Sequence, residues 1–164
     1  VVLPSTRGDY PGGVTGVFPK LVVRPPHHLD ALYVDATSGE LRHARWRWDG
    51  RVEDLEVQTV DVGLNGSPQR EIARDYTLVA TPDGRLLAAW QDATFGDLWL
   101  GRAAGQPAQW DTWPWSTDGG TGFFPCIVYT DADNPPLLIY GRWTFPQVRT
   151  IHQELVVQTF QDRR

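Results

Sequence analysis

Short apolar runs separated by turn residues recur along the chain, and they predict strands rather than helices. Three such runs are Leu21-Val22-Val23, Leu78-Val79-Ala80 and Ile127-Val128-Tyr129. The segments Thr81-Pro82-Asp83-Gly84 and Trp48-Asp49-Gly50 are typical of hairpin connections, because Asp and Gly adopt the tight or left-handed backbone that a hairpin needs. Only Ser67–Glu71 resembles a helix start, and we expect one short turn there.

A five-residue motif recurs at intervals of 57 and 50 residues. Its copies are Tyr33–Thr37, Trp90–Thr94 and, in a weaker form, Tyr140–Thr144. A matching run follows each copy, at Gly39–Arg42, Gly96–Trp99 and Pro146–Arg149. A further run closes the unit, at Val57–Asp61, at Trp113–Asp118 and, less clearly, at Val157–Phe160. Each repeat therefore predicts four strands.

In the first two repeats the motif contains an acidic residue, and a glycine follows the motif two residues later. We expect Asp35 and Asp92 to accept hydrogen bonds from the backbone of their own turns. Gly39 and Gly96 are then expected to take a positive φ, which glycine adopts without a steric penalty. These residues are predicted to shape the turns rather than to bind a ligand.

The repeat length decides the predicted architecture. A four-stranded antiparallel unit of about 50 residues cannot bury both of its faces alone, whereas such units stack radially into propellers of about four to eight blades. We therefore predict an all-β chain, a β-propeller built of four-stranded antiparallel blades, with three blades in this chain. We place an opening strand with its linker and the three blades at residues 1–15, 16–69, 70–119 and 120–164.

Three blades are too few to close a ring. Either two chains form a homodimer with a six-bladed ring, or this chain is part of a longer propeller. The third repeat has no hairpin signal between Val148 and Phe160. The opening strand Val1–Leu3 could complete that blade, in the same or in a neighbouring molecule.

Three segments of the first repeat resemble a known tandem repeat. They are Phe18–Val23, Tyr33–Trp46 and Val57–Asp61, and they are similar to the sialidase-like, or BNR-type, propeller repeat of secreted bacterial proteins. The resemblance is strongest over the first repeat and extends over nearly the whole chain. It implies a propeller that is secreted or displayed at the cell surface, outside the cytoplasm, and it does not imply catalysis.

Composition narrows the classes of partner. The chain has 15 basic and 20 acidic residues, without the concentrated cationic stripe that a nucleic acid requires. Its longest apolar stretches are far shorter than the roughly 20 residues that cross a bilayer. We therefore expect no nucleic-acid partner and no membrane span. Cys126 is the only cysteine, so no intrachain disulfide can form.

Motifs for catalysis, cofactors and metals are missing from the sequence. There is no nucleophile motif, nucleotide loop or paired-carboxylate signature, so we expect no catalytic residue and no cofactor. His27 and His28 are adjacent and point apart in a strand, while His43 is expected to pack or to form hydrogen bonds. Asp131 and Asp133 lack the glycine and the closing glutamate of a calcium loop. We expect no metal site.

Aromatic content is the remaining distinctive feature, with 8 Trp in 164 residues. Aromatic faces stack on sugar rings, and neighbouring arginines can satisfy hydroxyl groups. The candidate ligand-binding residues are Trp99, Trp113, Trp143, Arg42 and Arg142. Packing between blades is the competing interpretation of these tryptophans and the preferred one, as it is for Trp90 and Tyr33 inside the second strands.

The leading hypothesis is a non-catalytic, extracytoplasmic propeller module that binds a glycan or a protein surface. One alternative is a fragment of a sialidase-type glycoside hydrolase, in which an arginine cluster would clamp a carboxylate. Another is a structural accessory subunit of a large surface or membrane assembly. Fold alone does not choose among them, because propellers host many unrelated functions.

Overall fold

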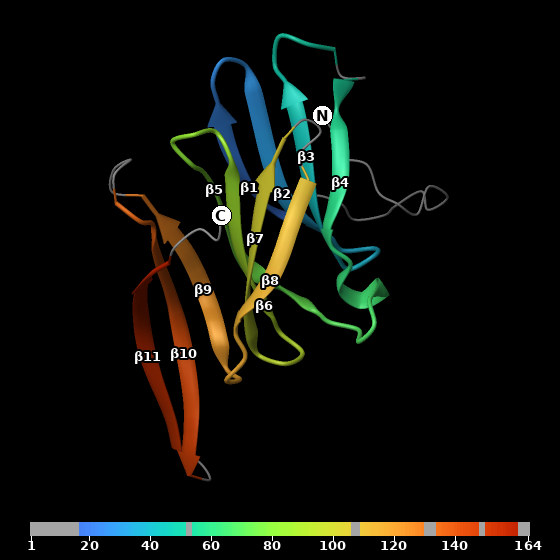
Figure 1. Ribbon diagram of the computed structural model, residues 1–164. Helices are drawn as coiled ribbons and strands as arrows, with labels where there is room; N and C mark the ends of the chain where they lie inside the picture. Colours follow the sequence, from blue (N-terminus) through green and yellow to red (C-terminus); the bar gives the residue numbers. More distant parts are fainter. Residues whose placement is uncertain (1–16, 52–53, 106–108, 130–133, 148–149, 161–164) are drawn as a thin grey trace. The chain divides into compact units, whose positions relative to one another are not determined.

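The chain folds into three antiparallel β-sheets (Figure 1). The computed structural model describes residues 17–51, 54–105, 109–129, 134–147 and 150–160. Contacts divide the chain into two compact units, residues 1–74 and 75–164. The prediction of an all-β chain is confirmed. Closure of the sheets into a propeller is not seen, and it stays a prediction.

The first sheet contains four strands in sequence order. They are β1 (Val17–Arg24), β2 (His28–Asp35), β3 (Glu40–Arg47) and β4 (Glu56–Asp61). A short 3-10 turn, η2 (Gly63–Asn65), follows β4. Each strand pairs with the strand next to it in the chain, as successive hairpins do.

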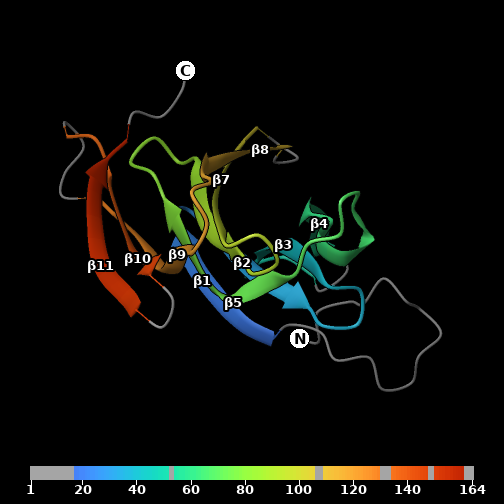
Figure 2. The same ribbon diagram turned by 90° about the horizontal axis from the view of Figure 1, so that it is seen from below.

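The second sheet repeats this order, and the third sheet has one strand fewer among the described residues. The strands of the second sheet are β5 (Ile72–Ala80), β6 (Leu86–Asp92), β7 (Asp97–Ala104) and β8 (Gln109–Ser116). Those of the third sheet are β9 (Thr121–Val128), β10 (Leu137–Gln147) and β11 (Thr150–Thr159). Figure 2 shows β10 between β9 and β11, so that β11 forms the outer edge of the third sheet.

The two turns that follow β2 and β6 have the predicted geometry. Oδ1 of Asp35 accepts hydrogen bonds from the backbone N–H groups of Thr37 and Ser38, at 3.0 and 3.3 Å. Asp92 does the same for the two corresponding residues of its own turn, at 2.9 and 3.3 Å. Gly39 and Gly96 both have a φ of 72°. The structural role predicted for the two aspartates is thus confirmed.

The helix start expected at Ser67–Glu71 is wrong. The helical turn, η2, lies earlier, and the chain then bends instead of continuing as a helix. The backbone N–H of Arg70 donates to the carbonyl of Gly63 at 3.1 Å, and its guanidinium donates to Asp61 at 2.8 Å. These contacts tie Arg70 back to the end of β4, which prevents a helical path.

The third repeat also departs from the predicted strand pattern. We expected a third strand to begin at Pro146–Arg149 and a fourth at Val157–Phe160. Instead β10 continues to Gln147, and β11 pairs with it from Thr150 to Thr159. The missing hairpin signal after Val148 therefore reflects one long strand. Because that strand stays paired with β10, the third sheet has no separate fourth strand among the described residues. The predicted strand Val1–Leu3 and the acidic loop at Asp131 and Asp133 lie outside the described residues.

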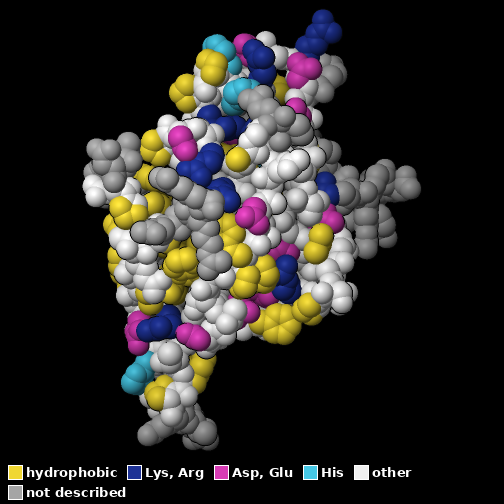
Figure 3. Space-filling view, in the orientation of Figure 1, with side chains coloured by type: hydrophobic (Ala, Val, Ile, Leu, Met, Phe, Trp, Pro, Cys, Tyr) yellow, Lys and Arg dark blue, Asp and Glu magenta, His cyan; other side chains and the backbone are white. Residues whose placement is uncertain are grey.

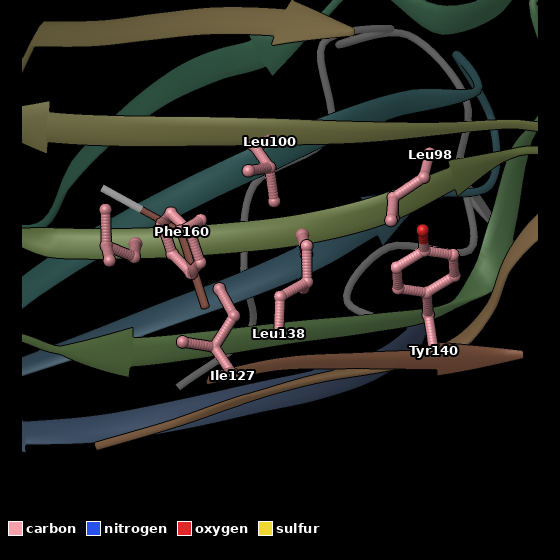
Figure 4. Packing of buried hydrophobic residues seen from close by; sticks show 8 residues of the cluster. Leu98, Leu100, Ile127, Leu138, Tyr140 and Phe160 are labelled. Carbon is pink, nitrogen blue, oxygen red and sulfur yellow. The ribbon is translucent and has the colours of Figure 1, made fainter. Parts of the chain in front are cut away.

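Apolar side chains between the second and third sheets form the main core of the second unit (Figure 4). The second sheet contributes Leu87, Ala89, Leu98 and Leu100, and the third contributes Ile127, Leu138, Tyr140 and the adjoining Phe160. Small Ala89 lies among larger neighbours, which lets the two sheets interdigitate. Tyr33 and Trp90 are fully buried, as predicted for side chains inside the second strands.

Among the described residues, none of the helical segments has the length and hydropathy needed to cross a membrane.

Truncation of Leu138 tests the importance of this core. Leu138 is 0% exposed, so Leu138→Ala should lower the free energy of unfolding by about 2–5 kcal/mol through lost burial and a residual cavity. Urea unfolding followed by tryptophan fluorescence measures the change. Leu64→Ala removes the same atoms at a position that is 45% exposed and should cost much less. Equal losses for both variants would contradict the assignment of the core.

Candidate functional site

The predicted ligand residue Trp99 is used in packing. Its ring stacks on that of Trp90, its partner across β6 and β7, with centroids 6.5 Å apart and planes at 23°. A Cβ atom at Gly101 would lie 2.9 Å from the Trp90 ring, so this neighbour must stay small. Trp113 lies on the opposite face of the second sheet, since it pairs with Leu100, and packs against the main core.

Trp143 is held in a second aromatic stack. Its ring lies 4.2 Å from that of Phe123, with planes at 17°. The backbone N–H of Trp143 donates to the carbonyl of Gly120 at 2.6 Å. Gly120 has a φ of 61°, and a Cβ atom there would lie 2.5 Å from the Trp143 carbonyl oxygen. The turn before β9 therefore fixes the place of Trp143.

Both predicted arginines are paired with glutamates. In the first unit, Arg42 is buried and bonds Glu40 through Nε and Nη2, at 2.9 and 2.6 Å. Glu40 also accepts a hydrogen bond from Asn65, at 3.0 Å. In the second unit, Nη2 of Arg142 donates to Glu154 at 2.6 Å. Each guanidinium already has a carboxylate beside it.

The five predicted residues are divided between the two units. Arg42 belongs to the first unit and the other four belong to the second. Within the second unit, Trp99 and Trp113 lie on opposite faces of one sheet. Arg142 and Trp143 are consecutive in β10 and so point to opposite faces of the next. A ligand site built from these residues stays a prediction.

A buried carboxylate that the sequence did not single out lies in the first sheet. Asp30 is 0% exposed and accepts hydrogen bonds from Arg24 at 2.7 Å and Arg45 at 3.1 Å, while Nε2 of His43 lies 2.8 Å away. Burial alone would raise the pKa of Asp30, but the hydrogen bonds from His43 and Arg24 hold it well below its usual range. The hydrogen-bonding role predicted for His43 is confirmed.

This charged cluster has a structural rather than a ligand-binding character. Its members surround Asp30 and form hydrogen bonds with its carboxylate oxygens. Burial, together with the charges of Arg45 and Arg24, lowers the pKa of the neighbouring His28. Among the residues that the structure describes, no three His, Cys, Asp or Glu side chains are placed to hold a metal ion.

The most exposed tryptophan of the described chain is Trp48, which was not among the predicted site residues. It lies in the turn after β3, is 44% exposed and meets the ring of His27 edge-on, with centroids 5.7 Å apart. Its position in a turn was the available signal, because turn side chains have fewer neighbours than strand side chains.

One face of the third sheet carries exposed apolar side chains. Pairing aligns Ile139 with Val157 and Gly141 with Leu155, so these positions share a face, opposite to Leu138 and Tyr140. We call this the outer face, and its side chains are Phe123, Cys126, Ile139, Trp143, Leu155 and Val157. Figure 3 shows hydrophobic side chains gathered where Figure 1 places the third sheet.

The residues of the outer face are equivalent, in the repeat, to the residues through which the second sheet packs against the third. The repeat aligns Trp90 with Tyr140, and hence Ala89 with Ile139. Ala89 pairs with Leu100 as Ile139 pairs with Val157, and Gln91 pairs with Leu98 as Gly141 pairs with Leu155. The matched positions and their exposed fractions are Leu98 at 0% and Leu155 at 74%, and Leu100 at 1% and Val157 at 56%.

Comparisons with known proteins give no relative to guide the interpretation of these surfaces: no protein-family model matches the chain, and no curated protein matches it either.

Substitution of Asp30 tests the charged cluster. Asp30→Asn leaves the partly buried Arg24 and the buried Arg45 without their counter-charge, and should cost about 3–5 kcal/mol at pH 7. Because folding lowers the pKa of Asp30, its stabilisation is complete well above the ordinary value of 3.8 and is lost as the pH falls below it. Urea midpoints of the wild type should drop in that acid range, and those of the variant should drop less.

A matched control for Asp30 is Asp49, which pairs with Arg47 at the surface. Asp49→Asn should change the urea midpoint little, because an ion pair at the surface is screened by water and stabilises the fold only weakly. If Asp30→Asn were as mild as Asp49→Asn, the cluster would not be a stabilising element of the first sheet.

Proposed function

We propose that this chain is a binding and scaffolding module, three sheets of a β-propeller, whose outer face on the third sheet binds a β-sheet of another copy of the chain. The observation that carries the proposal is the exposure of Leu155 and Val157. The residues at the same positions of the second sheet, Leu98 and Leu100, are buried against the next sheet.

The physical reason is the cost of leaving this face in water. Burial of a leucine or valine side chain contributes about 1.5–3 kcal/mol, so Leu155 and Val157 alone supply a substantial part of an association energy. Monomeric proteins rarely expose large contiguous apolar patches, and such patches mark interaction surfaces. Burial of this face against a protein surface is therefore favourable in free energy compared with its exposure to water.

The edge of the third sheet strengthens the proposal. β11 is a ten-residue edge strand, and its sequence contains one acidic residue, Glu154, and neither lysine nor proline. Edge strands that must stay unpaired usually carry lysine, other charged residues or proline, which hinder pairing with another strand. The predicted strand Val1–Leu3 would occupy this edge as the fourth strand of the blade, in the same or in a neighbouring molecule.

The propeller architecture and the extracytoplasmic location are parts of the same proposal. The architecture is supported by the repeat, by the two matching four-stranded sheets and by the packing between the second and third sheets. The location is supported by the resemblance to BNR-type repeats of secreted bacterial proteins. A role as an accessory subunit of a larger assembly is compatible with a face that binds a β-sheet.

The structural roles of the candidate residues favour a protein partner over a glycan. Trp99 and Trp113 support the second sheet, and Trp143 contributes to the apolar outer face beside Phe123. The sialidase alternative requires arginines that are available to clamp a substrate carboxylate. Since Arg42 and Arg142 are each paired with a glutamate, that alternative receives no support from their geometry.

Two charges on the outer face test the proposed function. Leu155→Glu with Val157→Glu should leave the fold intact, because both side chains are mainly exposed, but it should abolish association. Sedimentation velocity should show association of the wild type, and its melting temperature should rise with protein concentration, since binding stabilises the folded state. The double variant should show neither effect.

The control adds the same charge elsewhere in the second unit. Gln109→Glu with Thr117→Glu changes two exposed positions outside the outer face and should associate as the wild type does. A monomeric wild type with a concentration-independent melting temperature would refute the proposed function. So would association that survives the two charges at Leu155 and Val157.

A further inference from the structure

We infer that the sheet which covers the outer face is the first sheet of a second copy of this chain. The inference rests on the proposed function and names the sheet of the second copy that makes the contact. The second and third sheets pack through two different kinds of face. The chain has one further face of each kind, one on the third sheet and one on the first sheet.

The packing between the second and third sheets joins two unlike faces. One face, from the second sheet, presents Leu98 and Leu100 beside the small Ala89. The other, from the third sheet, presents a set of larger side chains, Ile127, Leu138 and Tyr140. In Figure 4, Leu98 points toward the ring of Tyr140, and Leu100 lies over Leu138 and Ile127.

The outer face corresponds to the first kind of face. Leu155 and Val157 replace Leu98 and Leu100 in register, as the pairing with β10 shows. Because a surface of this kind is covered by a face like that of Ile127, Leu138 and Tyr140, the expected occupant is a sheet with apolar residues at those same positions.

The first sheet carries that second kind of face. Leu21 pairs with Ala31 in β1 and β2 as Ile127 pairs with Leu138 in β9 and β10. Two residues further along β2, Tyr33 stands where Tyr140 stands in β10. Ile127 is 4% exposed against its neighbouring sheet, whereas Leu21 is 60% exposed. Val23, which shares its face, is 59% exposed.

A chain with one face of each kind associates head to tail. Such a contact between unlike faces is heterologous, and it closes into a ring when the rotation between copies permits. Two copies supply six sheets, which lies within the usual range of about four to eight blades. A closed dimer with two equivalent contacts is therefore expected. Edge-to-edge pairing of β11 with its own copy would leave Leu155 and Val157 of the outer face, and Leu21 and Val23 of the first sheet, exposed to water.

Disulfide trapping between two differently substituted chains tests the inference. The native thiol is first removed by Cys126→Ser, because Cys126 is exposed on the outer face. Leu21→Cys and Val157→Cys are then introduced into separate chains, at the positions equivalent to Ile127 and Leu100. The chains are mixed and oxidised mildly, and the products are separated on a non-reducing gel and weighed by mass spectrometry.

We expect a disulfide between the Leu21→Cys chain and the Val157→Cys chain, in a particle of dimer mass. His152→Cys is the matched control, since it lies on β11 but faces away from Leu155 and Val157. It is exposed, and it should give several-fold less product with the Leu21→Cys chain. Each cysteine chain oxidised alone should give little dimer.

The outcomes separate this inference from the proposed function. Preferred coupling of Val157→Cys with itself overturns the inference. The same holds if association requires Leu155 and Val157 but yields no product with Leu21→Cys, in which case the outer face still binds a sheet. Absence of any association overturns both.

Discussion

The burial of apolar faces between neighbouring antiparallel sheets is the constraint on which this structure depends. A four-stranded sheet of this size has two faces, and its own hairpins cover neither of them. The second and third sheets meet this constraint for each other, with Leu98 and Leu100 against Leu138 and Tyr140. The turns of the chain fix which side chains lie on each face, and one face of the third sheet remains exposed.

Turn chemistry prepares the faces by fixing register. The carboxylates of Asp35 and Asp92 bind the backbone of their own turns, and a glycine with positive φ follows each of them. A slip of one residue would move every apolar side chain to the opposite face of the sheet. The conformation of the two turns is therefore a condition for the packing of the sheets, although no turn residue belongs to the main core.

The first sheet stabilises part of its interior in a different way. Asp30 is buried, and its carboxylate is contacted by two arginines and a histidine on the neighbouring strands β1 and β3. Such a network is costly to desolvate, but it is specific, because removal of one partner leaves a buried charge. The third sheet instead has an apolar outer face, on which Leu155 and Val157 are exposed.

The sequence by itself determined the strands, most of the hairpin turns and the pairing of like positions between repeats. Alternation of apolar and polar residues and the Asp–Gly spacing are local signals, so Asp35, Gly39 and the burial of Tyr33 and Trp90 could be predicted. Tertiary structure decided that β11 is one long strand, that His43 and Arg45 converge on Asp30, and that Val157 is exposed whereas Leu100 is buried. Those outcomes depend on which residues meet across strands and on whether a neighbouring sheet is present. The alternation of apolar and polar residues along one strand does not indicate which residues meet across strands or whether another sheet covers a face.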